Sequence, residues 1–199
     1  MARKIMVITG SPRKKGNTNT VVTWFVDAAR KASAEVEVVD AAHLEYKANG
    51  CTECMACQQS DKYECVIDDE ASAVIARIPE FDVLVCATPV FWFGPSAQLK
   101  LLLDRTFALI KFNPETGEPI HGESGPDKIM CLIATAGGDQ ESGLNMLDDV
   151  FRTAAVFSQC RYESLLVSFA PSDPKQMAER TDVKEQAIAL AERVTAGHV

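Results

Sequence analysis

Residues 5–20, IMVITGSPRKKGNTNT, decide the fold of this chain. The run IMVI at residues 5–8 is continuous rather than alternating, which is typical of a parallel strand buried on both faces. Gly10 and Pro12 mark a turn, and an apolar pattern with helical spacing begins at Val21. The stretch therefore predicts a strand, a tight loop and a helix, in that order.

The loop of this unit has the composition of an anion site. A helix that starts directly after a strand presents unpaired backbone N–H groups and the positive end of its dipole to the loop. The glycine spacings GxGxxG and GxxxxGK[ST] are absent, which argues against a dinucleotide or a nucleoside triphosphate and favours a terminal phosphomonoester. Hydroxyl, amide and guanidinium donors come from Ser11, Arg13, Asn17, Thr18, Asn19 and Thr20. An ordinary capped turn between strand and helix is the alternative interpretation.

The pattern GSPRxxGNT at residues 10–18 resembles the FMN phosphate loop of the flavodoxin-like NAD(P)H-dependent FMN reductases. Electron-carrier flavodoxins usually have a loop rich in Thr and Ser without the arginine, so Arg13 favours the reductases. The resemblance implies that NAD(P)H donates electrons and that the flavin N5 atom, rather than an acid–base pair of side chains, carries out the chemistry. It also implies that the FMN phosphate is held by Ser11, Arg13, Gly16, Asn17, Thr18 and Asn19.

The composition limits the class of protein. A chain of 199 residues with 47% hydrophobic residues can bury one substantial core, which predicts a single domain over residues 1–199. A net charge of −8 argues against nucleic acid and anionic membrane surfaces as partners. No apolar run approaches the length of a membrane span, and residues 1–10 lack the features of a signal peptide. We therefore expect a cytoplasmic protein.

Alternating strand and helix patterns predict an α/β fold: a doubly wound sheet of five parallel strands in three layers, α/β/α. Helices are expected at residues 19–32, 71–78, 96–105, 145–158 and 173–195, and strands at residues 5–8, 35–39, 81–87, 128–134 and 163–169. Thr18 or Asn19 is expected to cap the first helix, and Asp68 or Asp69 the second. The resemblance implies the flavodoxin-like strand order 2-1-3-4-5, with FMN at the point where the order reverses.

Residues 41–67 interrupt this alternation with a long loop, and loops of this length inside a domain are usually functional. The loop contains four of the seven cysteines, with the spacing C-x2-C-x2-C-x7-C. Three closely spaced thiolates can converge on one iron–sulfur cluster, with a fourth ligand from further along the chain. The four candidate metal ligands are Cys51, Cys54, Cys57 and Cys65. A zinc site and a metal-free thiol loop are the alternatives.

This cysteine spacing resembles the compact motif of the iron–sulfur flavoproteins, a branch of the same fold family that carries a [4Fe–4S] cluster beside FMN. Cluster-free FMN reductases also have cysteines in this loop, followed by an acidic pair like Asp68 and Asp69. The presence of cysteine at all four positions favours the cluster over the metal-free loop.

Two further loops follow central strands and are expected to face one crevice at the carboxyl edge of the sheet. Residues 89–94 offer an aromatic wall on a backbone restrained by proline, and the paired glycines in residues 135–138 let a ligand approach the backbone. Both resemble flavin loops of the family, which implies that the isoalloxazine ring lies between them. The candidate residues are Pro89, Val90, Phe91, Trp92, Phe93, Gly94, Thr135, Ala136, Gly137 and Gly138.

Several other residues receive structural predictions. Lys100, Asp104 and Arg105 lie in an apolar helical segment, and their spacing predicts an i,i+4 ion pair and a contact at the helix terminus. Cys86, within a buried strand, is expected to be a small core residue. Residues 112–126 are rich in turn formers and predict a surface excursion.

Together these features predict an FMN-dependent NAD(P)H oxidoreductase. It would pass electrons through FMN, and through a [4Fe–4S] cluster where one is bound, to a small-molecule or protein acceptor. The alternative is a non-enzymatic iron–sulfur/flavin electron carrier between redox proteins, which the acidic surface and the four cysteines fit nearly as well. A redox sensor without turnover is a third hypothesis. Family members commonly form dimers with the flavin near the interface, which implies a homodimer or homotetramer.

Overall fold

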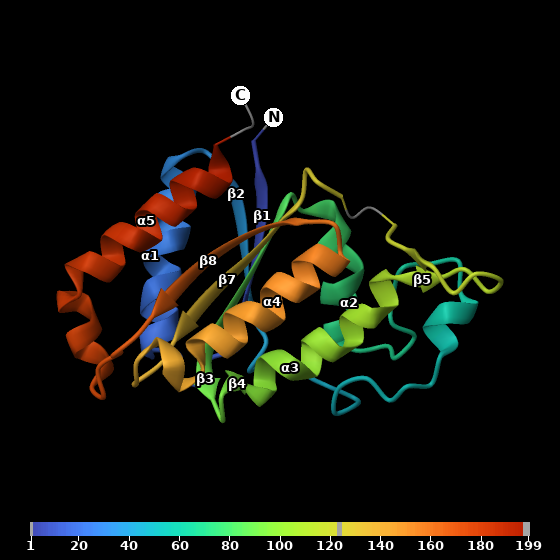
Figure 1. Ribbon diagram of the computed structural model, residues 1–199, viewed down its shortest axis with the longest axis horizontal. Coiled ribbons are helices and arrows are strands. Elements are labelled where there is room, and N and C mark those ends of the chain that lie inside the picture. The colour runs from blue at the N-terminus through green and yellow to red at the C-terminus, as the bar shows by residue number, and fades with distance from the viewer. Residues whose placement is uncertain (1, 123–124, 197–199) are drawn as a thin grey trace.

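The computed structural model describes residues 2–122 and 125–196 of the chain. Five parallel strands form the central sheet in the order β2-β1-β3-β7-β8 (Figure 1). These are the five long strands in chain order, so the predicted order 2-1-3-4-5 is confirmed. Their bounds are Lys4–Thr9 for β1, Glu35–Asp40 for β2, Val83–Phe91 for β3, Ile129–Thr135 for β7 and Arg161–Val167 for β8.

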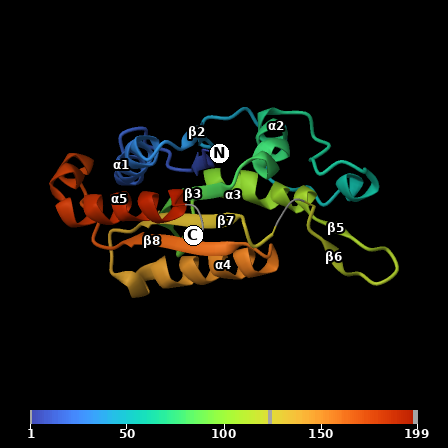
Figure 2. The ribbon, with the colours of Figure 1, turned by 90° about the horizontal axis from the view of Figure 1, so that it is seen from above.

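Helices cover both faces of the sheet and complete the predicted three layers. Alternate residues of β1 point to opposite cores, because side chains of a strand alternate between the two faces. Ile5 and Val7 pack with α1 (Asn17–Lys31) and α5 (Thr181–Thr195), which lie side by side in Figures 1 and 2. Met6 and Ile8 pack with residues of α2 (Glu70–Arg77), α3 (Ala97–Leu103) and α4 (Asn145–Phe157). Among the described residues, no helix is both long and apolar enough to cross a membrane.

Short elements decorate the connections. β4 (Gly94–Pro95) pairs antiparallel with the end of β3, and β5 (Lys111–Phe112) pairs with β6 (Pro119–Ile120) in the predicted surface excursion. Residues 123–124 of that excursion lie outside the described residues. Short 3-10 segments occupy Ala56–Gln59, Ile78–Glu80, Asp104–Leu109 and Pro174–Glu179, and a π-type segment, Gln140–Leu144, precedes α4.

The expected cap of the first helix is wrong. α1 begins at Asn17 with Gly16 in the N-cap position, two residues before the expected start. The side chains of Thr18 and Asn19 bind elsewhere: Thr18 Oγ1 lies 2.7 Å from Thr135 Oγ1, and Asn19 Nδ2 donates to Arg13 O at 3.1 Å. Side-chain contacts across the loop, which local sequence preferences do not encode, therefore move the helix start.

Other boundaries also shift. The last helix starts at Thr181 rather than at residue 173, because Pro174 opens a separate 3-10 segment. The predicted cap of α2 is confirmed for Asp69, whose carboxylate accepts a hydrogen bond from Ser72 N at 3.0 Å. Cys86 is buried in β3, as expected for a core residue, and burial raises the pKa of its thiol to about 12.

Candidate functional site

The loop between β1 and α1 places an uncapped helix end at the carboxyl edge of the sheet. No side chain in the described part of the chain caps α1, so backbone N–H groups of its first turn remain available to a ligand. Gly10 N donates to Ala87 O at 2.8 Å and Ser96 Oγ donates to Gly10 O at 2.6 Å, which ties the loop to β3 and to the start of α3. These bonds hold the start of the loop in one position.

The polar side chains predicted to bind the phosphate differ in their exposure and in their hydrogen-bond partners. Arg13 is exposed, and Ser11 is buried with its hydroxyl 3.4 Å from Arg13 N. Thr18 and Asn19 bind other protein groups, so they offer an anion their backbone N–H groups rather than their side chains. Asn17 Nδ2 donates to Pro171 O at 2.8 Å, while Asn17 Oδ1 is buried with no hydrogen-bond partner among the described residues.

The two predicted flavin loops lie together around a cavity of about 340 Å³. Pro89, Phe91 and Thr135 do not line it, although Val90, between the first two in β3, does. Thr135 is buried against Thr18. Gly94 pairs with Phe91 in the β3–β4 hairpin and does not line it either. The lining residues are Val90, Trp92, Phe93, Ala136, Gly137, Gly138 and Ser142.

Two parts of this site were not predicted. Ser142 lines the cavity and donates through its hydroxyl to Asp139 Oδ1 at 2.7 Å, a bond that lowers the pKa of Asp139. The spacing Asp-x-x-Ser at residues 139–142 is a capping pattern that could have indicated this turn. The segment after β8 also borders the site, because Phe169 N donates to Gly138 O and Ala170 N to Ala136 O, both at 2.8 Å.

The aromatic turn, residues 91–94, has a strained backbone. Trp92 and Phe93 have φ values of 49° and 62°, the left-handed region that a two-residue hairpin turn requires and that Asn and Gly normally occupy. Trp92 is 94% exposed, so its side chain gains almost nothing from burial in the folded chain. Strain of this kind is characteristic of ligand sites, because the surrounding structure must hold it.

Replacement of Trp92 by Asn is expected to raise the free energy of unfolding by about 0.5–1 kcal/mol, because Asn tolerates positive φ. Urea denaturation monitored by circular dichroism measures the change. Phe91→Asn is the control, since Phe91 lies in the strand and has no positive φ to relieve. Equal or lower stability of Trp92→Asn relative to the parent chain would show that the turn is not strained.

The cysteine loop does not gather its four thiols into one site. Among the described residues, no three His, Cys, Asp or Glu side chains lie together as a metal ion would require. Cys51 and Cys54 are exposed, Cys57 is buried and Cys65 is half-buried. A backbone hydrogen bond from Ala56 lowers the pKa of Cys54. The donor chemistry therefore fits an iron–sulfur cluster, whereas this arrangement of the loop does not.

The distal half of the cysteine loop is anchored to the segment that follows α3. Gln58 Nε2 donates to Ile110 O at 2.9 Å, and the Lys111 ammonium donates to Cys57 O and, at 2.6 Å, to Lys62 O. Glu53 and Met55, on either side of Cys54, have φ values of 54° and 57°. The part of the loop that carries Cys51 and Cys54 is thus exposed and strained, while the part with Cys57 is held in place.

Arg105 lies directly after the C-cap of α3, where a contact at the helix terminus was expected, but its guanidinium contacts the start of α2. Its side chain is fully buried and lies in the base of the cysteine loop. Nη1 lies 2.7 Å from Asp69 Oδ2, Nη2 lies 3.0 Å from Ile67 O, and both Nε and Nη2 lie 3.4 Å from Cys65 Sγ. The guanidinium therefore connects a candidate metal ligand to the cap of α2. The predicted pair of Lys100 and Asp104 is present on the surface.

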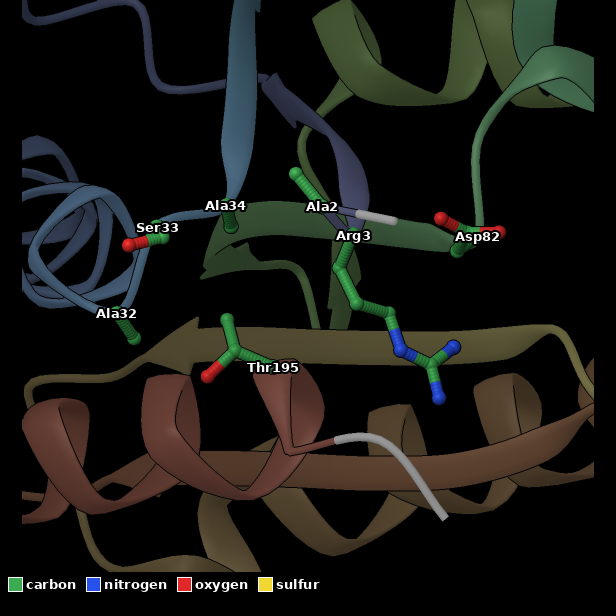
Figure 3. Close-up of a pocket in the computed structure, with 7 residues that line it drawn as sticks. All are labelled: Ala2, Arg3, Ala32, Ser33, Ala34, Asp82 and Thr195. Atoms are coloured by element: carbon green, nitrogen blue, oxygen red, sulfur yellow. The ribbon is translucent and has the colours of Figure 1, made fainter.

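A larger cavity, about 510 Å³, lies at the opposite, amino edge of the sheet (Figure 3). Figure 3 shows Arg3 and Asp82 near the starts of strands, Thr195 on α5, and Ala32, Ser33 and Ala34 at the turn between α1 and β2. The Asp82 carboxylate already accepts from Lys4 N at 2.8 Å. Ligands of open α/β sheets bind at the carboxyl edge, so the smaller cavity is the candidate site.

Comparison with known proteins identifies the family of this chain. Residues 3–162 match the family described as NADPH-dependent FMN reductase. An iron–sulfur flavoprotein of Methanocaldococcus jannaschii is 30% identical over 148 residues, which span 74% of this chain and 71% of that protein. An iron–sulfur flavoprotein of Methanosarcina thermophila is 33% identical over 110 residues, 55% of this chain and 56% of that protein.

The fold has close counterparts among solved structures. An NAD(P)H:quinone oxidoreductase from Methanothermobacter marburgensis superposes with a TM-score of 0.72 at 14% identity, covering 100% of this chain and 99% of that one. At 14% identity the structural likeness shows a shared fold alone, whereas the sequence matches show the family. The chain belongs to the NADPH-dependent FMN reductase family, in its iron–sulfur flavoprotein branch.

Proposed function

We propose that this protein is an FMN-dependent NAD(P)H oxidoreductase that passes electrons to a small-molecule or protein acceptor. The cavity between the aromatic turn and the Gly137–Gly138 turn is the observation that carries the proposal. It is lined by apolar side chains, bare backbone and the Ser142 hydroxyl, a lining that suits a planar heterocycle with polar edges. When bound, FMN would supply hydride transfer at N5.

The residues around the site fit FMN. The uncapped start of α1 and the exposed Arg13 suit a phosphate. Ser11, in the loop between β1 and α1, adds a hydroxyl group. The unpartnered Asn17 Oδ1 suits a site that a ligand completes, because buried polar atoms normally have a partner. The backbone of residues 136–138 is fixed by the segment after β8 and would position the ring rather than take part in proton transfer.

A [4Fe–4S] cluster on Cys51, Cys54, Cys57 and Cys65 is the second part of the proposal. The spacing of the thiols and the two iron–sulfur flavoprotein relatives support it. Binding would require the exposed part of the loop to move toward Cys57 and Cys65, since the described residues hold no preformed metal site. We also propose a homodimer or homotetramer; the cytoplasmic location stays a prediction from sequence.

The alternative is a non-enzymatic electron carrier, which would bind the same cofactors but would not react with NAD(P)H. One experiment separates the hypotheses: anaerobic purification, analysis of flavin, iron and sulfide, and a visible spectrum before and after NADH or NADPH. Bleaching of the flavin bands by nicotinamide supports the oxidoreductase, and unchanged bands support the carrier or a sensor. Flavin without iron would contradict the cluster, and a chain that binds no FMN would contradict the whole proposal.

Gly137→Ala is expected to weaken FMN binding by about tenfold while the free energy of unfolding stays within about 0.5 kcal/mol of the parent chain. A Cβ atom at this position meets no protein atom within 4 Å, so the folded chain accommodates it. Because Gly137 lines the cavity, the added methyl group would take up space that the flavin ring needs. Quenching of FMN fluorescence gives the affinity, and urea denaturation gives the stability. Unchanged affinity would place the flavin elsewhere.

A further inference from the structure

Ser142 adds a hydroxyl group to the otherwise apolar cavity between the aromatic turn and the Gly137–Gly138 turn. Among the described residues that line this cavity, the others are apolar or glycine, apart from the indole N–H of Trp92. An indole only donates, so Ser142 is the lining residue whose side chain can accept a hydrogen bond. The residue is exposed, which leaves it within reach of a ligand.

Two glycines allow Ser142 to lie at this position. A Cβ atom on Gly138 would lie 2.7 Å from both Cβ and Oγ of Ser142, so the serine packs directly on the backbone of the Gly137–Gly138 turn. Gly143 has a φ of 106°, and a Cβ atom there would lie 3.0 Å from Phe93 Cα. The segment that carries Ser142 therefore contacts both walls of the cavity, which is possible because residues 138 and 143 have no side chain.

The hydrogen bonds of Ser142 determine the role of its hydroxyl group. Ser142 Oγ donates to Asp139 Oδ1 at 2.7 Å, and Ser142 N donates to the same oxygen at 2.9 Å. A carboxylate only accepts, so the one hydrogen of the hydroxyl is used in this bond while the lone pairs of Oγ stay available. The bond is charge-assisted, since it also lowers the pKa of Asp139 and so keeps the carboxylate ionised at neutral pH. Toward the cavity, Ser142 thus presents an acceptor.

We propose that Ser142 is a specificity-determining residue of the flavin site, whose Oγ accepts a hydrogen bond from the imide N–H of the flavin ring. Asp139 is the positioning residue that holds the hydroxyl in this orientation. The oxidised ring system of FMN has one ring N–H, at N3, and a donor that loses water on binding needs an acceptor. The carbonyl oxygens of Ala136 and Gly138, in the same lining, already accept from the segment after β8. The inference rests on the proposed binding of FMN in this cavity.

Equilibrium binding of FMN and of 3-methyl-FMN to the full chain tests the proposal, with quenching of flavin fluorescence as the measurement. The two ligands differ only in the methyl group that replaces the N3 hydrogen. We expect the parent chain to bind FMN about fivefold or more tightly than 3-methyl-FMN. Ser142→Ala should lose most of this preference through weaker binding of FMN, because 3-methyl-FMN has no N–H for Ser142 to accept.

Asp139→Gly tests the positioning role. Glycine is tolerated at the start of a helical segment, but it removes the carboxylate and leaves the hydroxyl hydrogen of Ser142 free to turn toward the cavity. We expect the preference for FMN over 3-methyl-FMN to fall by about twofold or more, although Ser142 is still present. Asp173→Gly is the matched control, because Asp173 also caps a short helical segment, accepts from Lys175 N at 3.0 Å and does not line the cavity.

The measured affinities separate this inference from the proposed function. Equal weakening of both ligands in Ser142→Ala would show that Ser142 only packs against the ring, and an unchanged preference would show that it does not meet the N–H. Either result, in a parent chain that binds FMN, overturns the inference alone, and an unchanged preference in Asp139→Gly overturns the role of Asp139. A parent chain without affinity for FMN overturns the proposed function together with this inference. Ser158→Ala, at the other end of α4, should leave both affinities unchanged.

Discussion

Replacement of Arg105 by Met is expected to lower the free energy of unfolding by about 3–5 kcal/mol, because it leaves the buried carboxylate of Asp69 without its cation. The Arg105 side chain is 0% exposed and that of Asp69 is 2% exposed, so water cannot replace the lost ion pair. The same change removes the hydrogen bond to Ile67 O and the contacts with Cys65 Sγ. Guanidinium chloride denaturation at neutral pH measures the loss.

Lys100→Met is the matched control for this variant. Lys100 lies on α3, five residues before Arg105, and pairs with Asp104 on the surface, where both side chains are at least 40% exposed. Exposed i,i+4 pairs contribute about 0.3–0.5 kcal/mol, so this variant should retain nearly all of the stability. Equal losses of stability in the two variants would show that the buried Arg105 pair contributes no more to the free energy of unfolding than the exposed Lys100 pair.

Arg105 also determines how the cysteine loop is held. We expect Cys65 in Arg105→Met to react faster with iodoacetamide than in the parent chain, as mass spectrometry of labelled peptides would show. The labelling of Cys51 and Cys54 should change little, because these thiols are already exposed. Unchanged labelling of Cys65 would mean that other contacts, such as those of Lys111, suffice to hold the loop.

The same ion pair predicts a loss of stability in acid. Burial alone would raise the pKa of Asp69, but hydrogen bonds from Arg105, Lys47 and Ser72 outweigh that effect and lower the pKa to about 2. A carboxyl group whose pKa is lower in the folded chain contributes stability above its unfolded pKa of about 4. This contribution should disappear as the pH falls from about 4 to about 2. The pH dependence of unfolding of Arg105→Met should show less of this contribution, because only Lys47 and Ser72 remain as donors to Asp69.

Gly10→Ala is expected to cost about 2–3 kcal/mol of stability and to reduce FMN affinity by about tenfold or more. A Cβ atom on Gly10 would lie 2.7 Å from Ser96 Oγ and 2.9 Å from Leu99 N, and closer still to Leu99 Cβ. The backbone of α3 cannot move aside easily, since Leu99 is fully buried in the core. The loop would therefore have to shift away from α3, together with the start of α1.

Gly94→Ala is the control for Gly10→Ala, because a Cβ atom on Gly94 meets nothing within 4 Å. Its free energy of unfolding should stay within about 0.5 kcal/mol of the parent chain. Denaturation and FMN titration of the two variants give both quantities. If Gly10→Ala were as stable as Gly94→Ala, the loop would be free to relax. If Gly10→Ala bound FMN as tightly as the parent chain, the loop would not be part of the flavin site.

Local patterns were sufficient for the architecture. Strand patterns separated by helical periodicity predict five parallel strands, and the described residues form five; their order was expected from the resemblance to the family and is confirmed. The cap of α2 by Asp69 and the surface pair of Lys100 and Asp104 were predictable for the same reason, since each involves residues three or four positions apart. The carboxyl edge of a parallel sheet also follows from topology, which explains why two predicted loops meet at one cavity.

Local sequence was therefore enough to predict the alternation of strands and helices and the two loops that meet around the cavity. Only the tertiary structure decided the burial of Arg105 against Asp69, the contact of Thr18 with Thr135 and the positive φ of Trp92 and Phe93. Partners 36 and 117 residues apart in sequence leave no periodic signal. Such contacts form because the packed sheet excludes water, so a buried polar group must find whichever partner the fold brings near it.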